Sequence, residues 1–338
     1  MKAIKIVKPF EMKVVEMEKP ACKAGEVMLQ LKYVGFCGSD LNTYRGRNGL
    51  AKMPVIPGHE IGAVIVEKGS DVPEQLHIGE TVTVNPYTNC GQCSACRRRR
   101  YNACENNETL GVQRDGAMRE YITLPWEKII PVGDITAEHS AIIEPMSVGF
   151  HAVNRAQVVD TDVVLVIGCG MVGVGAVARC LVRGATVIAC DLDDDKLSVV
   201  KRIGVQYVIN TAREDLHKRL MEITDGQMPD VIIEAVGSPV TQEEAVNEVS
   251  FTGRVVCIGY AKQDTPFTTS LFVKKELDIR GSRNALPEDF KGVIKYLKRG
   301  NCPYQDLISS VVSPEDAPEA MANWHNHPQK VFRILVKF

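Results

Sequence analysis

The sequence of 338 residues lacks several features that mark particular classes of protein. No apolar run reaches the roughly 18 residues that a membrane span requires, so we expect no membrane contact. The segment from Met1 to Pro20 alternates charged and apolar side chains without the apolar stretch of a signal peptide, and we therefore expect a cytoplasmic protein. Forty Lys and Arg against 42 Asp and Glu leave a formal charge of -2, which argues against a nucleic-acid-binding surface built on bulk positive charge.

Composition and length favour a folded protein with more than one domain. Hydrophobic residues make up 45% of the chain and charged residues 24%, which excludes disorder. Because the chain is longer than a usual domain of roughly 100–200 residues, we expect two domains. Eleven cysteines are an odd number in a chain without a secretion signal, so metal ligation or burial explains them better than a disulfide framework.

The pattern of apolar residues changes twice along the chain. Residues 1–147 carry short β-type runs separated by Gly, Pro and Asn, which predicts an irregular, mostly β domain. Residues 148–284 alternate apolar strands with helical stretches, which predicts an α/β domain with a doubly wound parallel sheet. We expect residues 285–338 to return to the first domain. The predicted strands are 27–34, 61–67 and 81–84 in the first region, 163–167, 186–190, 206–209, 231–235, 255–259 and 277–280 in the second, and 331–338 at the end, after a helix at 287–298.

A glycine-rich turn follows the first strand of the second region. The strand at 163–167 leads into Gly168-Cys169-Gly170-Met171-Val172-Gly173, and a helical stretch comes next. Gly168 would allow a tight turn, Gly170 would let the backbone approach a pyrophosphate, and Gly173 would allow the helix to pack closely on the strand. The start of the helix, with Met171 and Val172, would offer free N–H groups to phosphates. A methyltransferase-like or purely structural turn is the alternative.

An acidic residue strengthens the dinucleotide interpretation. The strand that follows the glycine turn and its helix ends at Asp191, where a carboxylate can bind both ribose hydroxyls of an adenosine. Asp193, Asp194 and Asp195 follow closely and would repel a 2′-phosphate. The sequence therefore favours NAD over NADP.

Four cysteines lie in one short segment, at about 88–106. Cys90, Cys93, Cys96 and Cys104 are spaced by three, three and eight residues, so one loop can wrap a single ion. Four thiolates make a closed tetrahedral zinc site with no position for a substrate, which indicates a structural role. An iron-sulfur cluster is the alternative, although the spacing differs from that of ferredoxins. The run Arg97–Arg100 could form a nucleic-acid patch, but between these cysteines a solvated loop is the better interpretation.

A second group of metal-ligand residues is dispersed along the first region. It comprises Cys37 in Cys-Gly-Ser-Asp, His59 and Glu60 in Gly-His-Glu, and Glu144 in Glu-Pro. Taken singly, a cysteine is usually buried filler and a histidine is usually a hydrogen-bonded core residue. Spacing alone leaves a metal site here weakly supported.

The five motifs together, in this order, resemble those of the zinc-dependent medium-chain dehydrogenases, which include alcohol, sorbitol and threonine dehydrogenases. The resemblance spans essentially the whole chain. It implies a GroES-like catalytic domain, formed by both ends of the chain, and a Rossmann domain, with the active site between them. It also implies a catalytic zinc held by Cys37, His59 and either Glu60 or Glu144, with a position left for water or substrate. Glu144 in place of a cysteine is typical of the polyol and threonine branch.

Such a site implies the oxidation of a secondary alcohol. Zinc would lower the pKa of the hydroxyl, and a hydride would pass to the nicotinamide of NAD. Ser39 would take the hydroxyl proton and pass it toward the cofactor ribose, unless it only caps a turn. Many relatives carry a histidine where this chain has Asn42, and asparagine cannot titrate. The onward proton path must then use water, the ribose or another group.

The substrate is suggested by a further resemblance. The segment 274–290, together with Tyr44-Arg45-Gly46 and residues 111–116, resembles bacterial hexonate dehydrogenases, which oxidise C5 of L-galactonate, L-gulonate or L-idonate. The few aromatic residues near the expected ligands suggest a polar pocket. Candidates for holding a sugar-acid carboxylate are Arg45, Arg114, Arg283 and Asn284. Arg283 and Asn284 could equally well only shape the end of the last strand of the sheet.

Other functions are compatible with parts of the sequence. Sorbitol-like polyols and L-threonine are the alternative substrates. A catalytically inactive dinucleotide-binding regulator would be of another class, but it has no need of an open metal site, and a zinc-independent quinone reductase would lack both metal groups. Since relatives form dimers or tetramers, we expect a homodimer or homotetramer, in which the apolar strand at 255–259 or 277–280 could pair between copies.

Overall fold

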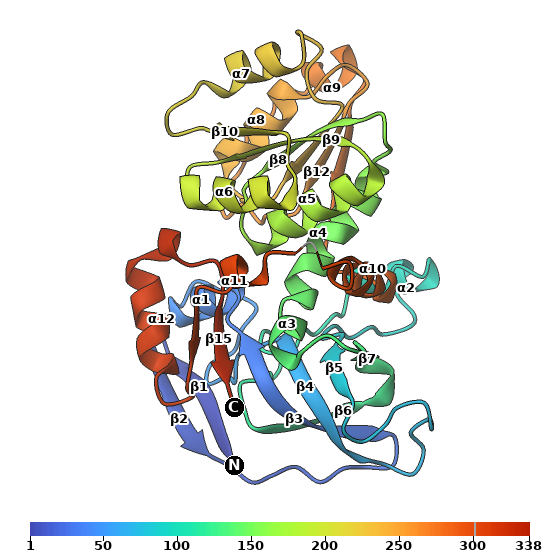
Figure 1. Ribbon diagram of the computed structural model, residues 1–338, viewed down its shortest axis with the longest axis vertical. Coiled ribbons are helices and arrows are strands. Elements are labelled where there is room, and N and C mark those ends of the chain that lie inside the picture. Colours follow the sequence, from blue (N-terminus) through green and yellow to red (C-terminus); the bar gives the residue numbers. More distant parts are fainter. Residues whose placement is uncertain (301) are drawn as a thin grey trace. The chain divides into compact units, whose positions relative to one another are not determined.

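The computed structural model describes residues 1–300 and 302–338, which divide into two compact units (Figure 1). Unit 1 combines Met1–Glu144 with Tyr304–Phe338, and unit 2 comprises Pro145–Pro303. The blue-to-green and red parts of the ribbon in Figure 1 therefore fold together as unit 1.

Unit 1 is built on a seven-stranded mixed sheet in the order β14-β15-β3-β4-β5-β7, with β6 paired to β3. The strands β3 (Glu26–Gly35) and β4 (Glu60–Lys68) form its long central antiparallel pair. Their side chains Leu29, Leu31 and Ile65 are fully buried in the core of the unit. The five other strands of this sheet are β5 (Thr81–Val84), β6 (Tyr121–Pro125), β7 (Ile129–Pro131), β14 (Ser310–Val312) and β15 (Ile334–Lys337). The strands β1 (Lys2–Lys8) and β2 (Glu11–Glu16) pair with each other outside it.

The helices of unit 1 are short. The strand predicted at 331–338 begins later than expected, at Ile334, and the 3₁₀ turn Pro328–Lys330 lies shortly before it. The helical elements are α1 (Gly38–Tyr44), α2 (Ser94–Arg97), α3 (Ala137–Ser140), α11 (Tyr304–Leu307), α12 (Ala317–Asn326) and the 3₁₀ turns η1 (Tyr101–Ala103), η2 (Trp126–Lys128) and η3 (Pro328–Lys330). Helix α4 (Ile143–Ala156) carries the chain into unit 2.

Unit 2 is an α/β unit with a six-stranded parallel sheet in the order β10-β9-β8-β11-β12-β13. The chain starts in the middle at β8, runs outward to β10, and then returns to β11 on the other side of β8. Such a reversal creates a crevice at the carboxyl ends of the two central strands, where ligands bind in doubly wound sheets. The strands are β8 (Val163–Ile167), β9 (Thr186–Asp191), β10 (Tyr207–Asn210), β11 (Val231–Glu234), β12 (Arg254–Cys257) and β13 (Asp278–Gly281).

Helices cover both faces of this sheet. Leu165 of β8 packs in one apolar cluster with Leu220 of α7 and Val249, which follows α8. On the other face, Cγ1 of Val166 lies 3.8 Å from the position that a Cβ on Gly173 of α5 would take. This alternation follows from the period of two along a strand, and right-handed crossovers place helices on opposite faces when the strand order reverses. The helices are α5 (Met171–Arg183), α6 (Asp194–Ile203), α7 (Leu216–Ile223), α8 (Pro239–Glu248), α9 (Ser270–Lys274) and α10 (Pro287–Leu297).

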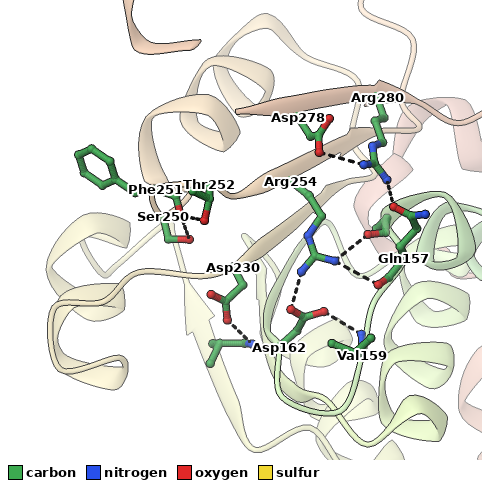
Figure 2. A network of polar contacts seen from close by, with 12 residues as sticks. Gln157, Val159, Asp162, Asp230, Ser250, Phe251, Thr252, Arg254, Asp278 and Arg280 are labelled. Carbon is green, nitrogen blue, oxygen red and sulfur yellow. Dashed lines mark hydrogen bonds and ion pairs between the residues drawn. The ribbon is translucent and has the colours of Figure 1, made fainter. Parts of the chain in front are cut away.

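Two arginines tie the segment before β8 to strands β12 and β13 (Figure 2). Arg254 donates to the carbonyl oxygen of Gln157 at 3.1 Å and pairs with Asp162. Arg280 donates to Gln157 Oε1 and to Asp278 Oδ2, both at 2.9 Å. Arg254 and Asp278 begin their strands, so this network lies at the amino ends of the strands, away from the ligand-binding edge. Its role is structural.

The predicted third segment, 285–338, begins too early. Unit 2 continues to Pro303, because helix α10 packs on unit 2. Buried Asp289 of α10 accepts a hydrogen bond of 2.6 Å from Asn154 Nδ2 and lies 2.8 Å from His151 Nδ1, both on α4. None of the helices in residues 1–300 and 302–338 has the length and apolar character of a membrane-crossing segment.

Candidate active site

The glycine turn of unit 2 has the geometry that its residues predict. Gly168 has a φ of 93°, and a Cβ on Gly173 would lie 1.8 Å from the carbonyl oxygen of Gly168. Gly170 is the N-cap of α5, and apart from its two neighbours in the chain no described residue comes within 4 Å of the position that its Cβ would take. Gly168 and Gly173 are therefore needed for the turn itself, whereas Gly170 leaves open space before the positive end of a 13-residue helix.

The acidic residues at the end of β9 and directly after it make different contacts. Asp191 ends β9, and its carboxylate accepts hydrogen bonds from the N–H groups of Cys169 at 2.7 Å and Asp193 at 3.1 Å. It thus lies directly beside the glycine turn. Asp193 caps helix α6, and Asp194 pairs with Arg213 at 2.7 Å. Asp193 and Asp194 therefore have structural roles in addition to the repulsion of a 2′-phosphate that the sequence predicts.

Two further glycines lie at the carboxyl ends of β11 and β12. The backbones of Gly237 and Gly259 are in such close contact that a Cβ on Gly259 would lie 2.1 Å from Gly237 N. Buried Glu234 fixes the first of these turns, since its Oε1 accepts hydrogen bonds from Val236 and Gly237 N–H at 2.8 and 2.7 Å. This edge therefore has a defined backbone surface next to the glycine turn of β8, the strand that pairs with β11.

The four cysteines of the lobe come together around one point. The Sγ atoms of Cys90, Cys93, Cys96 and Cys104 all lie within 4.8 Å of one another, and those of Cys93 and Cys104 are 3.9 Å apart. A zinc ion with Zn–S bonds of about 2.3 Å in a tetrahedron needs sulfur atoms about 3.8 Å apart. Hydrogen bonds from the backbone N–H groups of Gln92 and Cys93 lower the pKa of Cys90 to about 6, whereas burial raises the pKa of Cys96 to about 12. A bound cation is therefore needed to hold all four groups as thiolates. The lobe therefore fits a closed zinc site.

The lobe also carries the basic run that the sequence singled out. Arg97 to Arg100 are all exposed. Arg97 Nη1 donates to the carbonyl oxygen of Gln92 at 2.8 Å. This arrangement agrees with a solvated loop on the outside of the cysteine cluster.

The second predicted metal group is also brought together. The Sγ of Cys37 and one ligand atom each of His59 and Glu60 lie within 4.8 Å of one another, although Cys37 and His59 belong to separate segments of the sequence. Cys37 is the N-cap of α1, and Glu60 begins β4 opposite Gly35 of β3. A Cβ on Gly35 would lie 2.3 Å from Glu60 Oε2, so the glycine makes room for this carboxylate.

Buried Asp40 holds the two ligand loops together. Its Oδ2 accepts a hydrogen bond of 2.8 Å from the backbone N–H of Cys37, and its Oδ1 accepts one of 3.4 Å from Gly58 N–H, next to His59. On the other side, Arg333 lies 3.0 Å from Glu60 Oε2 and donates to the carbonyl oxygen of Phe36. These contacts fix the ligand-bearing backbone before any ion binds.

The charges and the burial of this group favour the binding of a cation. Burial acts to lower the pKa of His59, but the charges of Cys37 and Glu144 raise it well above its usual value. Burial raises the pKa of Glu60 to about 7, although Arg333 opposes the rise. His59 Nδ1 and Glu60 Oε1 are buried without a hydrogen-bond partner in the described chain. Buried ligand atoms with an excess of acidic groups fit a divalent ion.

Glu144 lies close to this group. Among the described residues, however, it does not belong to the set whose ligand atoms lie within 4.8 Å of one another. It is buried, and its charge raises the pKa of both His59 and Glu60. The hydroxyl of Tyr87 donates a hydrogen bond to Glu144 Oε1. Burial raises the pKa of Tyr87 well above its usual value, and Glu144 raises it further, so the phenol stays protonated and donates.

Ser39 has a free hydroxyl beside Cys37. Its Oγ is buried without a hydrogen-bond partner among the described residues, so it does not cap the turn. The capping bonds of α1 belong to Cys37 and Asp40 instead. A buried hydroxyl without a partner can bind a substrate group. Asn42 lies on the same helix, and its amide side chain cannot titrate.

The four candidates for substrate contact are in different surroundings. Arg45 is engaged with His325 of α12, to which it donates two hydrogen bonds, at 2.9 and 3.0 Å. Arg114 is partly buried in unit 1, and its Nε has no acceptor in the described chain. Arg283 and Asn284 follow β13 in unit 2, where Asn284 has a φ of 53°. Arg45 is therefore engaged and Arg114 is available within unit 1, whereas Arg283 and Asn284 belong to unit 2.

Three residues of the site were missed by sequence reasoning. Asp40 lay in a motif that we quoted, but no role followed from the sequence. Tyr87 adds an aromatic residue to a pocket expected to have few, and its only signal is its place in Asn-Pro-Tyr between β5 and the cysteine lobe. Arg333 gave no signal, because it lies near the opposite end of the sequence from Glu60.

Comparison with known proteins identifies the family. A family model described as an alcohol dehydrogenase GroES-like domain matches residues 23–134, and one described as a zinc-binding dehydrogenase matches residues 172–299. The chain belongs to the zinc-type alcohol dehydrogenase family. The predicted architecture, a GroES-like part with a Rossmann sheet, is thereby confirmed, as is the resemblance to zinc-dependent dehydrogenases.

Individual relatives cover nearly the whole chain. L-galactonate-5-dehydrogenase of Escherichia coli (strain K12) is 34% identical over 292 residues, which are 86% of this chain and 86% of that protein. Sorbitol dehydrogenase of Bacillus subtilis (strain 168) is 31% identical over 343 residues, with 99% and 97% covered. The crystal structure of a short chain alcohol dehydrogenase (rspB) from E. coli CFT073, complexed with cofactor NADH, is 30% identical, covers 100% of this chain and 99% of that chain, and has a TM-score of 0.92.

Proposed function

We propose that this protein oxidises a secondary hydroxyl of a sugar acid to a ketone, with NAD as the hydride acceptor. The substrate we infer is a hexonate such as L-galactonate, L-gulonate or L-idonate, oxidised at C5. The observation that carries the proposal is the cluster of Cys37, His59 and Glu60, whose ligand atoms lie within 4.8 Å of one another. A protein that only binds a dinucleotide has no use for such a cluster.

The relatives support this substrate class and one alternative. Similarity to L-galactonate-5-dehydrogenase favours a hexonate, whereas similarity to sorbitol dehydrogenase favours a neutral polyol. L-threonine is a further alternative. We prefer the hexonate because unit 1 offers an arginine without an acceptor, Arg114, which suits a carboxylate.

The cofactors we propose are two zinc ions and NAD. Cys37 and His59, with Glu60 or Glu144, would hold the catalytic zinc, and the four cysteines of the lobe would hold the structural zinc. When bound, the catalytic zinc supplies Lewis acidity that lowers the pKa of the substrate hydroxyl. The unpartnered Oγ of Ser39 would accept a hydrogen bond from the substrate hydroxyl and relay the proton toward the cofactor ribose or water as its own proton leaves.

NAD would bind along the carboxyl edge of the sheet in unit 2. The open space at Gly170 would admit the pyrophosphate, next to the N–H groups of Met171 and Val172 at the start of α5. Asp191, which lies beside the turn, would bind the adenosine ribose.

We also propose that the enzyme is a cytoplasmic homo-oligomer. All eleven cysteines are free, which suits a reducing compartment. Strand β13 ends the sheet of unit 2, and its Ile279 is 40% exposed, so a second copy could pair with this edge.

The test is a screen of NAD reduction combined with a metal assay. Purified protein should carry about two zinc ions per chain. It should reduce NAD with at least one hexonate in a set that also contains hexitols, pentitols and L-threonine. Chelation or Glu144→Ala should abolish turnover, while Glu74→Ala, which changes an exposed acid, should not. Full turnover by zinc-free protein, or no reaction with any of these alcohols, would contradict the proposal.

A further inference from the structure

We infer that Arg114 and Lys128 form the binding site for the carboxylate end of the substrate. The inference rests on the proposed function, because it names the part of unit 1 that would recognise the acid group of a hexonate. Lys128 was not among the residues that the sequence singled out.

The first support is the position of Arg114. Its carbonyl oxygen accepts a hydrogen bond of 2.8 Å from Gly111 N–H, so residues 110–114 form a tight loop. Leu110 N–H donates to the carbonyl oxygen of Pro86 at 3.1 Å, directly before Tyr87. On its other side, the loop packs so closely on Gly58 that a Cβ on Gly111 would lie 2.4 Å from Gly58 N. The loop of Arg114 thus touches the segments that carry Tyr87 and His59.

The second support is the position of Lys128. Its Nζ donates a hydrogen bond of 2.7 Å to the carbonyl oxygen of Tyr87, and its own carbonyl oxygen accepts one of 2.9 Å from Asn85 N–H. At the other end of the same tyrosine, the hydroxyl donates to Glu144. One tyrosine therefore connects an ammonium group with a carboxylate of the candidate zinc site.

A hexonate carries its acid group and its C5 hydroxyl several bonds apart. With C–C bonds of about 1.5 Å, C5 of an extended six-carbon acid lies about 5 Å from its carboxylate carbon. A substrate whose C5 hydroxyl lies at the cluster of Cys37 and His59 can then run along Tyr87 toward Lys128 and Arg114. The polar hydroxyls between the two ends would pass the tyrosine side chain.

The third support is the lack of an ion pair at either cation among the described residues. In residues 1–300 and 302–338, neither Arg114 nor Lys128 forms an ion pair, and Arg114 Nε is buried without an acceptor. Burial lowers the pKa of Lys128, and the charge of Arg114 lowers it further. Burial also lowers the pKa of Arg119; the charge of Asp115 opposes this, and Arg114 adds a smaller lowering.

The charge of Arg114 thus acts on two other cations, Lys128 and Arg119. Partly buried like charges destabilise one another unless an anion binds between them. Glu108 raises the pKa of Arg114, and Glu127 raises the pKa of Lys128. In both cases burial has the larger effect and lowers the pKa. A bound carboxylate would give Arg114 the acceptor that the chain does not provide, in the geometry that a guanidinium prefers.

The other candidates fit this task less well. The guanidinium of Arg45 is occupied by His325. Arg283 and Asn284 belong to unit 2, and each already has an interaction within the chain. Arg114 is the candidate that lies in the same unit as the cluster of Cys37, His59 and Glu60 and lacks an acceptor at Nε.

The test compares an acid with the alcohol of the same carbon skeleton. L-galactonate and galactitol differ only in the carboxylate, and sorbitol 6-phosphate tests a phosphate as the anion. Arg114→Met and Lys128→Met should each lower kcat/KM for L-galactonate about 10- to 100-fold, mainly through KM, as for a lost hydrogen bond to a charged group. Turnover of galactitol should stay within about twofold of wild type. Arg114→Lys should restore part of the loss, and Arg98→Met, which removes an exposed charge on the cysteine lobe, should change neither substrate.

Calorimetry supplies a readout that needs no turnover. L-galactonate should bind to wild-type protein, and more weakly to Arg114→Met at equal zinc content. If acid and alcohol lose activity equally, Arg114 is only structural and the inference is wrong. If the variants instead lose kcat/KM for sorbitol 6-phosphate and keep it for L-galactonate, the carboxylate assignment is wrong. Acid binding that depends on Arg114, but without NAD reduction, would support the anion site and contradict the proposed function.

Discussion

The glycines of the dinucleotide turn show how differently two similar residues respond to a side chain. A Cβ on Gly173 would overlap the carbonyl oxygen of Gly168 at 1.8 Å, and backbone cannot move aside as a side chain can. At Gly170 the same Cβ would meet nothing in the described chain within 4 Å beyond the two neighbouring residues. It would, however, occupy the space in front of helix α5 where we place the pyrophosphate.

We therefore predict that one alanine variant loses stability and that the other loses affinity for the cofactor. Gly173→Ala should destabilise the protein by about 3 kcal/mol, at the upper end of overpacking effects, and lower its melting temperature. Gly170→Ala should fold normally but bind NADH about tenfold more weakly, which corresponds to about 1.4 kcal/mol. Thermal unfolding and a fluorescence titration with NADH measure the two quantities. Normal NADH binding by folded Gly170→Ala would argue against a pyrophosphate at this position.

Tyr87 provides a second test at the scale of single residues. Tyr87→Phe removes only the hydroxyl that donates to buried Glu144, so the carboxylate loses one stabilising hydrogen bond. Losing such a bond costs about 1–3 kcal/mol, and we expect kcat to fall about tenfold or more. Zinc content should not change, because Cys37, His59 and Glu60 are untouched. A variant with unchanged kcat would mean that Tyr87 only fills space.

The sequence predicted which residues of the candidate metal site come together, but not the groups that hold them in place. Cys37, His59 and Glu60 stand in short motifs, and the fold brings them together as expected. Tyr87 and Arg333 act through contacts between distant segments, and no local pattern marks such contacts. Asp40 shows an intermediate case, since it lies in a recognisable motif but acts on the backbone of a second loop, at Gly58.

At the scale of elements, the cysteine lobe should depend on its metal. The lobe has little apolar core beyond its own cysteines, with Ala95 the only other hydrophobic residue in its described cluster. Such a small unit usually needs a metal or a cross-link to stay folded. Cys93→Ser should reduce the zinc content from about two ions per chain to one, and make residues 88–106 sensitive to protease.

The matched control for this variant is the exposed Ser94→Ala, next in sequence, which leaves all four thiols in place. Mass spectrometry of the fragments locates the cleavage. If Cys93→Ser keeps both zinc ions, or stays as resistant as the control, the four-cysteine site is not what orders the lobe.

The elements themselves were predicted well where the local pattern is strong. Strand β8 has the predicted bounds, and the other five strands of its sheet shift by two residues or less at either end, because buried parallel strands form continuous apolar runs. The end of unit 2 was predicted less well, at residue 284 instead of Pro303. Helix α10 belongs to unit 2 through buried Asp289 and its partners on α4, which lies far from it in the sequence.

At the scale of the whole molecule, the open question is the number of copies. The sheet of unit 2 ends at β13, whose residues Asp278, Ile279 and Gly281 are exposed. The sheet of unit 1 ends on one side at β14, where Val311 is 43% exposed. Both edges expose apolar side chains, but β13 belongs to a regular sheet whose strands could continue into a second copy about a twofold axis.

We predict that Ile279→Lys breaks the oligomer, whereas Val311→Lys leaves it intact. A lysine on an edge strand must be desolvated when another strand pairs there, which disfavours association. Light scattering coupled to size exclusion gives the mass directly: a multiple of 37.2 kDa for wild type and Val311→Lys, and 37.2 kDa for Ile279→Lys. The opposite result would assign the interface to unit 1, and a wild-type mass of 37.2 kDa would show that the edge of β13 stays unpaired in solution.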